Sequence, residues 1–438
     1  MTDCSRAIVL GGGIAGSYAA LLLRQRGVSV SLLEAHSWLG GRAFSFADRH
    51  SGRTLDNGPH VMLGCYRSMR AFLRLLGSES EFAIGRTLSV CYRTQQGTAA
   101  ALQLGGLPVP ISMPFALLRM PWPLGRRWAA LRGLVATLGR VDETWTLADW
   151  IERRGQSGEP AAWLWQPLCR AIMNVEPEEA SAAVFLATLR EAFSGSAKAA
   201  AFWIPKRPWS EIVGVPALRA LTASGVDVSL RSSVRALSIA DGRIAAIELG
   251  DGRSVAVGAD ALVISALPWH ALAKLLPAPM PFAQLQGAPL VSAHFAIAND
   301  CDAPPDEGPL TALVGGEPFH FLYRVPQARR GEFALLAGGC RALDGVSVAQ
   351  IEAQARAQVA RHYPEFRVDA AGTVRIRKES RATIAAAPKT DRMRPAPGAL
   401  AGGPANLRVC GDWTAVGLPS TLEGAARSAE RLVRGLAR

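Results

Sequence analysis

Residues 7–34 of the 438-residue chain read AIVLGGGIAGSYAALLLRQRGVSVSLLE, and this stretch decides the fold. Residues 7–10 are a short apolar run, which is typical of a buried strand. Small and aliphatic residues dominate 15–26 and indicate a helix, and 28–33 form a second apolar run of strand length. A strand, a helix and a second strand in this order predict a βαβ unit, the repeating unit of a parallel α/β sheet.

The loop between the first strand and the helix carries three glycines at G-x-G-x-x-G spacing, Gly11, Gly13 and Gly16. Gly11 permits the tight turn, Gly13 lets a pyrophosphate approach the backbone, and Gly16 lets the helix pack closely on the strand. The helix N-terminus adds free N–H groups and a partial positive charge. Glu34 ends the second strand, where a carboxylate can hold a ribose hydroxyl. An ordinary glycine turn would not explain all these features together, so we expect a dinucleotide-binding site.

A second glycine-rich loop, Gly40-Gly41-Arg42, follows Glu34 closely. Paired glycines allow close approach to the backbone, and an arginine offsets the charge of a diphosphate. In this position the loop resembles that of flavoproteins of the amine oxidase and phytoene desaturase type, in which it lies against the flavin side of the cofactor. The loop therefore favours FAD over a nicotinamide dinucleotide. The competing interpretation is a plain turn with a solvated arginine.

The composition indicates a large folded protein with a basic surface. Apolar residues make up 49% and charged residues 19% of the chain, which excludes an intrinsically disordered protein. The net charge is +12. Such a surface suits a phosphate-bearing cofactor, an anionic lipid or nucleic acid. The chain has no zinc, recognition-helix or RNA-binding motif and its arginines are dispersed, so nucleic acid is not an expected partner.

The seven cysteines are scattered, with no CxxC pair and no histidines at metal-ligand spacing. This pattern argues against a disulfide framework and against a metal site. The N-terminus does not resemble a secretory signal, so a reducing cytoplasm is the expected location. The longest uncharged run, residues 94–118, contains three prolines and three glycines, which would break a membrane-spanning helix.

The middle of the chain reads as mostly helical, and strands follow it. Helices are expected over 66–76, 149–154, 161–172 and 178–193, the last with Asn174 and Pro177 as start signals. A meander of strands is expected over 226–230, 234–239, 244–249 and 254–257, with Asp241-Gly242 and Asp251-Gly252 as hairpin turns, and a buried strand over 261–265. A second sheet is expected from 288–298, 312–314, 319–324, 333–338 and 374–377, covered by a helix over 348–363.

The last part of the chain returns to the cofactor. Residues 407–410 predict a strand, Gly411 and Asp412 follow at its end, and a helix is expected over 422–434. A carboxylate at a strand end can grip a ribityl hydroxyl, and the helix N-terminus can stabilise negative charge on a reduced flavin ring. The competing interpretation of Asp412 is an ordinary turn aspartate.

Four segments carry a narrower resemblance. They are LDNGPHVMLGCY (55–66), WQPLCRAIMNVEPEEASAAVFLATLRE (165–191), RATIAAAP (381–388) and GDWTAVGLPSTLEGAARSAERL (411–432). In them the chain resembles the FAD-dependent hydroxysqualene dehydroxylases, also called squalene-associated FAD-dependent desaturases, a branch of the amine oxidase and phytoene desaturase superfamily. The resemblance implies reductive removal of an allylic hydroxyl from hydroxysqualene to give squalene in hopanoid biosynthesis, with reduced FAD as the hydride source. Pro59 departs from the pattern, in which a polar residue such as glutamine is expected.

The resemblance implies an α/β fold in which a Rossmann-type FAD-binding domain is interleaved with an α+β substrate domain. We expect the FAD-binding domain to be assembled from residues 1–65, 210–285 and 395–438, and the substrate domain from 66–209 and 286–394. The residues expected to contact FAD are Gly11, Gly13, Ile14, Ala15, Gly16, Glu34, Ala35, Gly40, Gly41, Arg42, Gly58, Pro59, His60, Val234, Gly411, Asp412, Pro419, Ser420, Thr421 and Leu422.

The implied reaction requires a general acid that protonates the departing hydroxyl. His60 follows the DNG turn, and histidine titrates near neutral pH. Glu423 falls in the first turn of the last helix and Asp56 lies in the DNG turn, but both positions also favour acids for structural reasons. Tyr66 is a fourth candidate, and the sequence leaves the choice open.

A long-chain isoprenoid substrate implies access from a membrane. Residues 111–140 are rich in leucine, tryptophan and arginine. One face of an expected helix there carries Trp128, Leu131, Leu134, Val135 and Leu138. Basic residues beside tryptophan suit an anionic lipid surface, so peripheral association with the inner face of the cytoplasmic membrane is expected. The alternative is a helix that packs on the protein's own core.

Two further functions stay open. The first keeps FAD but oxidises its substrate, as a carotenoid desaturase or an amine oxidase; amine oxidation usually needs an aromatic cage, and the chain has only five tyrosines. The second is a non-catalytic prenyl-lipid-binding protein on a flavoprotein-like scaffold, which loss of the glycine motif or of Asp412 would favour. Both features are present. No second nucleotide motif indicates the electron donor.

Overall fold

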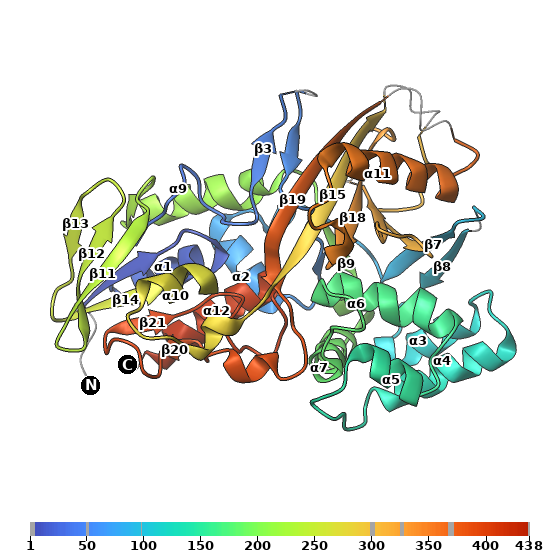
Figure 1. Ribbon diagram of the computed structural model, residues 1–438, viewed down its shortest axis with the longest axis horizontal. Coiled ribbons are helices and arrows are strands. Elements are labelled where there is room, and N and C mark those ends of the chain that lie inside the picture. The colour runs from blue at the N-terminus through green and yellow to red at the C-terminus, as the bar shows by residue number, and fades with distance from the viewer. Residues whose placement is uncertain are drawn as a thin grey trace.

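Two large sheets organise the chain. The computed structural model describes residues 5–49, 52–97, 99–297, 303–324, 328–366 and 372–436. A six-stranded sheet lies near the two chain ends, and a seven-stranded sheet lies toward the other end, beside a group of helices (Figure 1).

The six-stranded sheet begins with the predicted βαβ unit: β1 (Arg6–Leu10), α1 (Ile14–Gln25) and β2 (Ser29–Leu33). Its other strands are β10 (Asp227–Ser229), β14 (Ala261–Ser265), β20 (Gly398–Ala399) and β21 (Leu407–Val409). The order is β10-β2-β1-β14-β21-β20, and every pair is parallel except β20 with β21. The carboxyl ends of the parallel strands therefore meet at one edge, which is where open α/β sheets bind ligands.

Helices and a small meander cover the two faces of this sheet. Ala7 and Val9 of β1 point into a core shared with α1, and Ile8 and Leu10 point into a second core on the other face. The helices are α2 (Arg67–Leu76), α9 (Val215–Ala223), α10 (Trp269–Leu275) and α12 (Leu422–Gly435). The meander is β11 (Val234–Ala240), β12 (Arg243–Leu249) and β13 (Ser254–Ala256). The predicted Asp241-Gly242 turn is confirmed, since both residues have positive φ, 49° and 70°.

The seven-stranded sheet has the order β19-β15-β18-β17-β16-β7-β8. Its strands are β7 (Ser89–Thr94), β8 (Ala99–Gln103), β15 (Gly287–Ile297), β16 (Leu310–Val314), β17 (Phe321–Tyr323), β18 (Glu332–Gly338) and β19 (Gly372–Ile384). Helix α11 (Val348–His362) covers one face, as the sequence predicts, and buries Ile351, Ala355 and Val359 there.

The last strand of this sheet is confirmed but is longer than predicted, and two other strands of the sheet are not predicted by the sequence. The sequence predicts a last strand over only 374–377, but β19 continues to Ile384, because pairing with β15 holds its charged residues in a strand. The sequence also gives no strands near residue 90, whereas β7 pairs in parallel with β16 and so extends the sheet. The predicted strand over 288–298 ends at Ile297, and residue 298 lies outside the described residues.

Shorter elements connect the sheets. Two small ladders are formed by β3 (Ser45–Ala47) with β4 (Thr54–Asp56), and by β5 (Met62–Leu63), β9 (Phe202–Pro205) and β6 (Phe82–Ile84). Single helical turns occur at Glu79–Glu81, Ser210–Gly214, Pro281–Gln284, Arg341–Leu343 and Thr390–Met393.

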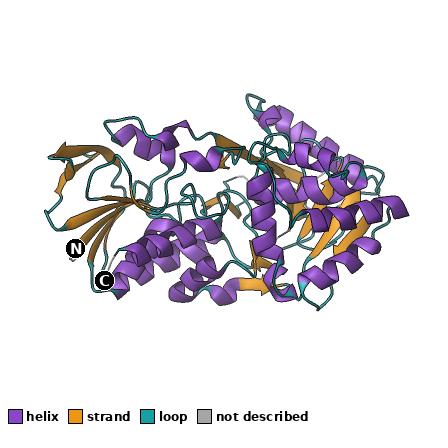
Figure 2. Ribbon diagram, turned by 90° about the horizontal axis from the view of Figure 1, so that it is seen from below, coloured by secondary structure: helices purple, strands orange, loops and turns teal. Residues whose placement is uncertain are grey.

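A layer of helices packs beside the seven-stranded sheet, at the end of the molecule opposite the chain termini (Figure 2). It comprises α3 (Val109–Leu118), α4 (Leu124–Ala136), α5 (Leu147–Arg153), a π-helical segment (Ala161–Trp165), α6 (Gln166–Met173), α7 (Ala182–Phe193) and α8 (Ala197–Ala200). The predicted helix over 178–193 begins later, at Ala182, because Ser181 caps it by accepting the Val184 N–H.

One buried glutamine ties the helical layer together. Gln156 is fully buried, and its Nε2 donates to the carbonyl of Ala129 on α4 at 2.8 Å. Its Oε1 accepts the indole N–H of Trp165 at 3.0 Å.

Within the described ranges, no helix combines the length and hydropathy that a bilayer crossing requires. The described cysteines are free thiols, and Cys4 and Cys301 lie outside the described residues.

Replacing Gln156 by leucine would leave the Trp165 N–H without a partner inside the core and would remove the second hydrogen bond of the Ala129 carbonyl, which stays bonded within α4. We expect Q156L to lower the free energy of unfolding by about 1–3 kcal/mol, because a buried unpaired group costs roughly 1–3 kcal/mol. Urea denaturation measures this loss. The exposed Gln103 provides the matched control, Q103L, for which a change below about 0.5 kcal/mol is expected; equal losses in the two variants would contradict the assignment.

Candidate active site

A cavity of about 1060 Å³ opens where the parallel strands of the six-stranded sheet end. This volume is at the upper end of the roughly 300–1,000 Å³ range of ligand sites. The predicted cofactor residues that line it are Gly11, Gly13, Ile14, Ala15, Glu34, Ala35, Gly40, Gly41, Arg42, His60, Val234, Gly411, Asp412, Ser420, Thr421 and Leu422. The lining does not include Gly16, Gly58, Pro59 or Pro419.

The three glycines of the first loop have different surroundings. A Cβ on Gly16 would lie 1.9 Å from the carbonyl oxygen of Gly11, so only glycine lets α1 pack this closely on the loop. A Cβ on Gly13 would meet nothing nearer than the Cα of Gly41, at 3.8 Å. The space in front of Gly13 is therefore open to the cavity, as close approach of a phosphate requires.

Glu34 is held rigidly at the edge of the cavity. Its Oε2 accepts the N–H of Gly12 at 2.6 Å, and its Oε1 accepts the N–H of His36 at 2.8 Å. The side chain is buried but still lines the cavity. Each carboxylate oxygen can accept more than one hydrogen bond, so Glu34 remains able to bind a hydroxyl donor.

The second glycine-rich loop lies against the first. The N–H of Gly40 donates to the carbonyl of Gly12 at 2.9 Å. Gly40 and Gly41 both have positive φ, 108° and 61°, and a Cβ on Gly41 would lie 3.1 Å from the Cα of Gly13. The two loops can approach this closely only because both consist of glycine at the contact.

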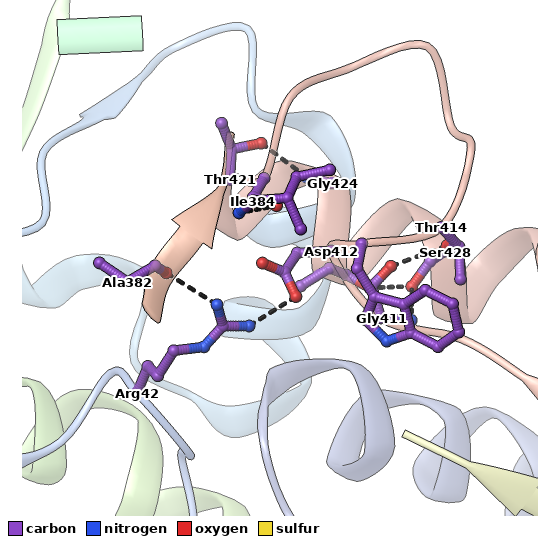
Figure 3. A network of polar contacts seen from close by, with 12 residues as sticks. Arg42, Ala382, Ile384, Gly411, Asp412, Thr414, Thr421, Gly424 and Ser428 are labelled. Carbon is purple, nitrogen blue, oxygen red and sulfur yellow. Dashed lines mark hydrogen bonds and ion pairs between the residues drawn. The ribbon is translucent and has the colours of Figure 1, made fainter. Parts of the chain in front are cut away.

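Arg42 joins this loop to the C-terminal part of the chain. Its Nη2 lies 2.5 Å from Oδ1 of Asp412, and its Nη1 donates to the carbonyl of Ala382 on β19 at 2.7 Å (Figure 3). Asp412 follows β21, and its residue surface is 7% exposed. One guanidinium thus contacts segments from both large sheets.

The loop after β21 is fixed by hydrogen bonds. The N–H of Gly411 donates to the Ser428 hydroxyl at 2.8 Å, and Gly411 has a φ of 140°. Thr421 caps α12 by accepting the N–H of Gly424 at 3.0 Å (Figure 3). The first turn of α12 lines the cavity. The guanidinium of Arg394, which is fully buried, donates to the carbonyls of residues 412, 413 and 414.

The charges in the cavity wall favour an anionic group. The basic residues of the wall are Arg42, Arg235, Lys274, Arg377 and Arg381, and the acidic residues are Glu34, Glu379 and Asp412. The wall also contains the N-terminal turn of α1, whose free N–H groups attract phosphate. A glycine-lined helix N-terminus, a held carboxylate and an excess of cations together fit a dinucleotide that carries a diphosphate.

Of the predicted acids, only His60 lines this cavity. Its ring meets the Trp209 ring edge-on, with the centroids 5.5 Å apart. The pKa of His60 is lowered to about 4, mainly by burial; a hydrogen bond to the Arg42 backbone opposes this shift, and the charge of Arg42 adds a smaller lowering. The ring is therefore neutral near pH 7, so it offers a ring N–H and not the imidazolium that its sequence position suggests.

The other predicted acids have structural contacts outside the cavity lining. Glu423 accepts the N–H groups of Ser68 (3.2 Å) and Met69 (2.9 Å) in the first turn of α2, which satisfies orphan donors of that helix. Asp56 accepts the hydroxyl of Ser45 at 2.7 Å and the backbone N–H of residue 209 at 2.9 Å. Neither carboxyl group lines the cavity, so a role for either as the acid stays a prediction. Tyr66 lines a separate cavity of about 40 Å³, and burial raises the pKa of its hydroxyl.

Nearly the whole chain matches one protein family. Residues 14–436 match the family model described as flavin containing amine oxidoreductase. The chain belongs to this family. The predicted FAD cofactor and oxidoreductase class are therefore confirmed for this flavoprotein.

Two curated relatives of the flavoprotein are similar to it along their whole length. Hydroxysqualene dehydroxylase from Rhodopseudomonas palustris is 30% identical over 430 residues, which cover 97% of this chain and 96% of that protein. Hydroxysqualene dehydroxylase from Sinorhizobium fredii is 31% identical with the same coverage. A solved structure of an oxidoreductase from Methanosarcina mazei has a TM-score of 0.73 at 18% identity and covers 97% of this chain and 99% of that one. This likeness confirms the predicted fold class.

Sequence reasoning missed the part of the flavoprotein's cavity that β19 supplies. Arg377, Glu379 and Arg381 line the cavity, and Arg377 donates to Oδ1 of Asn57 at 2.6 Å. The sequence contains a signal for them, because charged residues alternate through 375–381 as on one face of a strand. Four residues of α10 also line the cavity, His270, Ala271, Lys274 and Leu275. They follow the predicted strand over 261–265, but no motif marks them.

The two inner glycines predict two different defects. We expect Gly16→Ala to destabilise the flavoprotein by about 2 kcal/mol or more, because the methyl group would overlap the Gly11 carbonyl. Gly13→Ala meets no such obstacle, so its unfolding free energy without FAD should stay near that of the unchanged protein, while its affinity for FAD should fall at least about tenfold. Urea denaturation and fluorescence titration with FAD measure the two effects. An unaltered affinity in the Gly13 variant would contradict the role of this loop.

The lowered pKa of His60 predicts acid sensitivity. In the unfolded chain the ring titrates near pH 6.5, and in the folded protein near pH 4. As the pH falls from 6.5 to 4, the unfolded state takes up a proton first, so the free energy of unfolding decreases through this window. We expect the free energy of unfolding of His60→Gln, measured by urea denaturation, to decrease less steeply between pH 6.5 and 4.5 than that of the unchanged protein. The exposed His36 supplies the control, and the free energy of unfolding of H36Q should depend on pH as that of the unchanged protein does. The burial effect would be refuted if the His60 variant lost stability with falling pH as steeply as the unchanged protein.

Proposed function

We propose that this flavoprotein removes the allylic hydroxyl of hydroxysqualene and releases squalene. The observation that carries the proposal is full-length similarity at 30% and 31% identity to two hydroxysqualene dehydroxylases. In the reaction a carbon–oxygen bond of the substrate breaks and a carbon–hydrogen bond forms. The hydroxyl takes up a proton and leaves as water, and reduced FAD is oxidised by two electrons. Reduced FAD, when bound, supplies the hydride.

We propose that the cavity at the edge of the six-stranded sheet holds FAD. The open face of Gly13 and the first turn of α1 would receive the diphosphate, and Glu34 would bind a ribose hydroxyl. Asp412 would bind the ribityl chain, and the N-terminal turn of α12 would favour negative charge on the reduced ring. The support is that all these groups line one cavity and are fixed by hydrogen bonds within the protein.

We also propose that the two sheets correspond to two interleaved domains. Every strand of the six-stranded sheet comes from residues 1–65, 210–285 or 395–438, the ranges assigned to FAD. Every strand of the seven-stranded sheet comes from 66–209 or 286–394, the ranges assigned to the substrate.

The protein's own contribution to the proposed reaction is to hold and polarise the hydroxyl. An allylic carbon–oxygen bond ionises readily once its oxygen receives a proton or a strong hydrogen bond. His60 is the predicted acid that lines the cavity, and its neutral ring carries one N–H. This N–H would exchange its hydrogen bond to the Arg42 backbone for one to the substrate oxygen. The cationic wall disfavours a further positive charge, which is consistent with the neutral state of the ring.

We propose that the substrate reaches the flavoprotein from an anionic membrane, at the inner face of the cytoplasmic membrane. A thirty-carbon isoprenoid is almost insoluble in water, so the bilayer is its reservoir. The net charge of +12 favours attraction to anionic lipid.

A single-turnover experiment distinguishes the dehydroxylase from a desaturase or an amine oxidase. We expect anaerobic protein, reduced with one equivalent of dithionite, to convert hydroxysqualene to squalene while its flavin is reoxidised in equal amount. Free reduced FAD with the same substrate is the control and should give no squalene. Gas chromatography and the flavin absorbance near 450 nm follow the two events. The proposal fails if hydroxysqualene is unchanged while phytoene or an amine bleaches the oxidised flavin.

A further inference from the structure

Exposed apolar side chains gather on one small part of the surface. Fifteen large apolar residues are exposed in the described part of the chain, and eight of them fall between residues 107 and 138. These eight are Leu107, Ile111, Phe115, Leu118, Leu124, Trp128, Val135 and Leu138. The other seven lie on other parts of the chain, with at most two on any one element. Single exposed apolar residues are ordinary, but such a concentration marks an interaction surface.

The helices α3 and α4 produce this surface because each buries only one face. Helix α3 turns Met113, Ala116 and Leu117 inward, which leaves Ile111 and Phe115, one turn apart, facing outward. The two helices are consecutive in the chain and pack against each other (Figure 1). We call their outward side the α3–α4 face.

Helix α4 contributes differently from the sequence-based expectation. Small residues form its inner face, Ala129, Ala130 and Gly133, and the side chain of Gln156 occupies the space where a Cβ on Gly133 would lie. Leu131 and Leu134 are partly buried against the core, so they do not join the exposed face as predicted. Trp128 and Val135 are 61% and 70% exposed and do join it.

The chain segment that forms the α3–α4 face carries charge of one sign. Residues 82–141 contain seven arginines and no aspartate or glutamate. Arg119, Arg132 and Arg140 are exposed and form no ion pair within the described ranges. Arg126, by contrast, pairs with Glu159 at 3.2 Å. The apolar face is therefore bordered by cationic groups that are free to meet phosphates.

We propose that the α3–α4 face is the surface by which the protein docks on an anionic lipid bilayer. Exposed tryptophan, phenylalanine and leucine suit the headgroup boundary, and the arginines suit anionic headgroups. Helix α4 has 13 residues and is about 20 Å long, shorter than the roughly 30 Å hydrocarbon layer, so it would lie along the surface. A second copy of the chain would set like charges against each other on this face. The docking role rests on the proposed function, because a bilayer-dissolved substrate gives it its purpose.

Vesicle flotation with the full chain loaded with FAD tests the surface directly. We expect the protein to float with vesicles of phosphatidylglycerol and phosphatidylethanolamine, and L124E/W128E to lose at least about tenfold in partition coefficient. The matched control, I84E/V348E, adds the same two charges at exposed apolar sites elsewhere and should float like the unchanged protein. Thermal unfolding and flavin content should be the same in all three.

The arginines are tested separately and without disturbing the apolar face. On anionic vesicles the partition coefficient of R132Q/R140Q should fall about fivefold per arginine. On vesicles of phosphatidylcholine alone its partition coefficient should equal that of the unchanged protein. Equal flotation of L124E/W128E and the unchanged protein would overturn the proposal. The proposal would also be overturned if the unchanged protein did not float with the vesicles. That result would instead assign this face to a protein partner.

Activity in detergent separates this proposal from the proposed function. L124E/W128E should convert hydroxysqualene in detergent micelles at the unchanged rate and should be slow only with substrate in vesicles. If the unchanged protein floats through this face but forms no squalene in either medium, the dehydroxylase function fails and the docking surface stands. If it forms squalene in micelles and the α3–α4 variants float normally, the docking surface fails and the function stands.

Discussion

The ion pair between Arg42 and Asp412 is the contact on which the arrangement of the site depends. The two residues are 370 positions apart in the chain, yet Nη2 and Oδ1 are 2.5 Å apart. They meet because β2 and β21 belong to one sheet and their carboxyl ends share an edge. The same guanidinium binds the Ala382 carbonyl of β19, which belongs to the other sheet. One side chain therefore sets the relative positions of three segments around the cavity.

A charge pair of this kind is stable only when the polar groups around it also have hydrogen-bond partners. The fully buried Arg394 guanidinium holds the backbone that carries Asp412, through carbonyls at residues 412, 413 and 414. On the opposite wall, Glu34 is fixed by two backbone N–H groups. The cavity is thus shaped by contacts within the protein, and the groups proposed to hold FAD are positioned in advance, which lowers the entropic cost of binding.

The sequence predicts the features that depend on local sterics. The roles of Gly11, Gly13 and Gly16 follow from their spacing, and the parallel strands follow from apolar runs. The sequence does not predict the features that depend on a partner far away in the chain. The sequence indicates a structural acid at the start of a helix for Glu423 before a catalytic one, and only the position of α2, some 355 residues earlier, shows which backbone N–H groups it accepts. The full length of β19 likewise depends on pairing with β15, and the inward turn of Leu131 depends on the core beneath α4.

The most direct test of the central claim is a crystal structure of the protein with FAD bound. The account predicts FAD density inside the cavity lined by Gly13, Glu34 and Asp412, with the Arg42–Asp412 pair and the two glycine loops close to their positions described above. FAD density at any other site would contradict it. So would a cavity that must be rebuilt, with the Arg42–Asp412 pair broken, before FAD can enter.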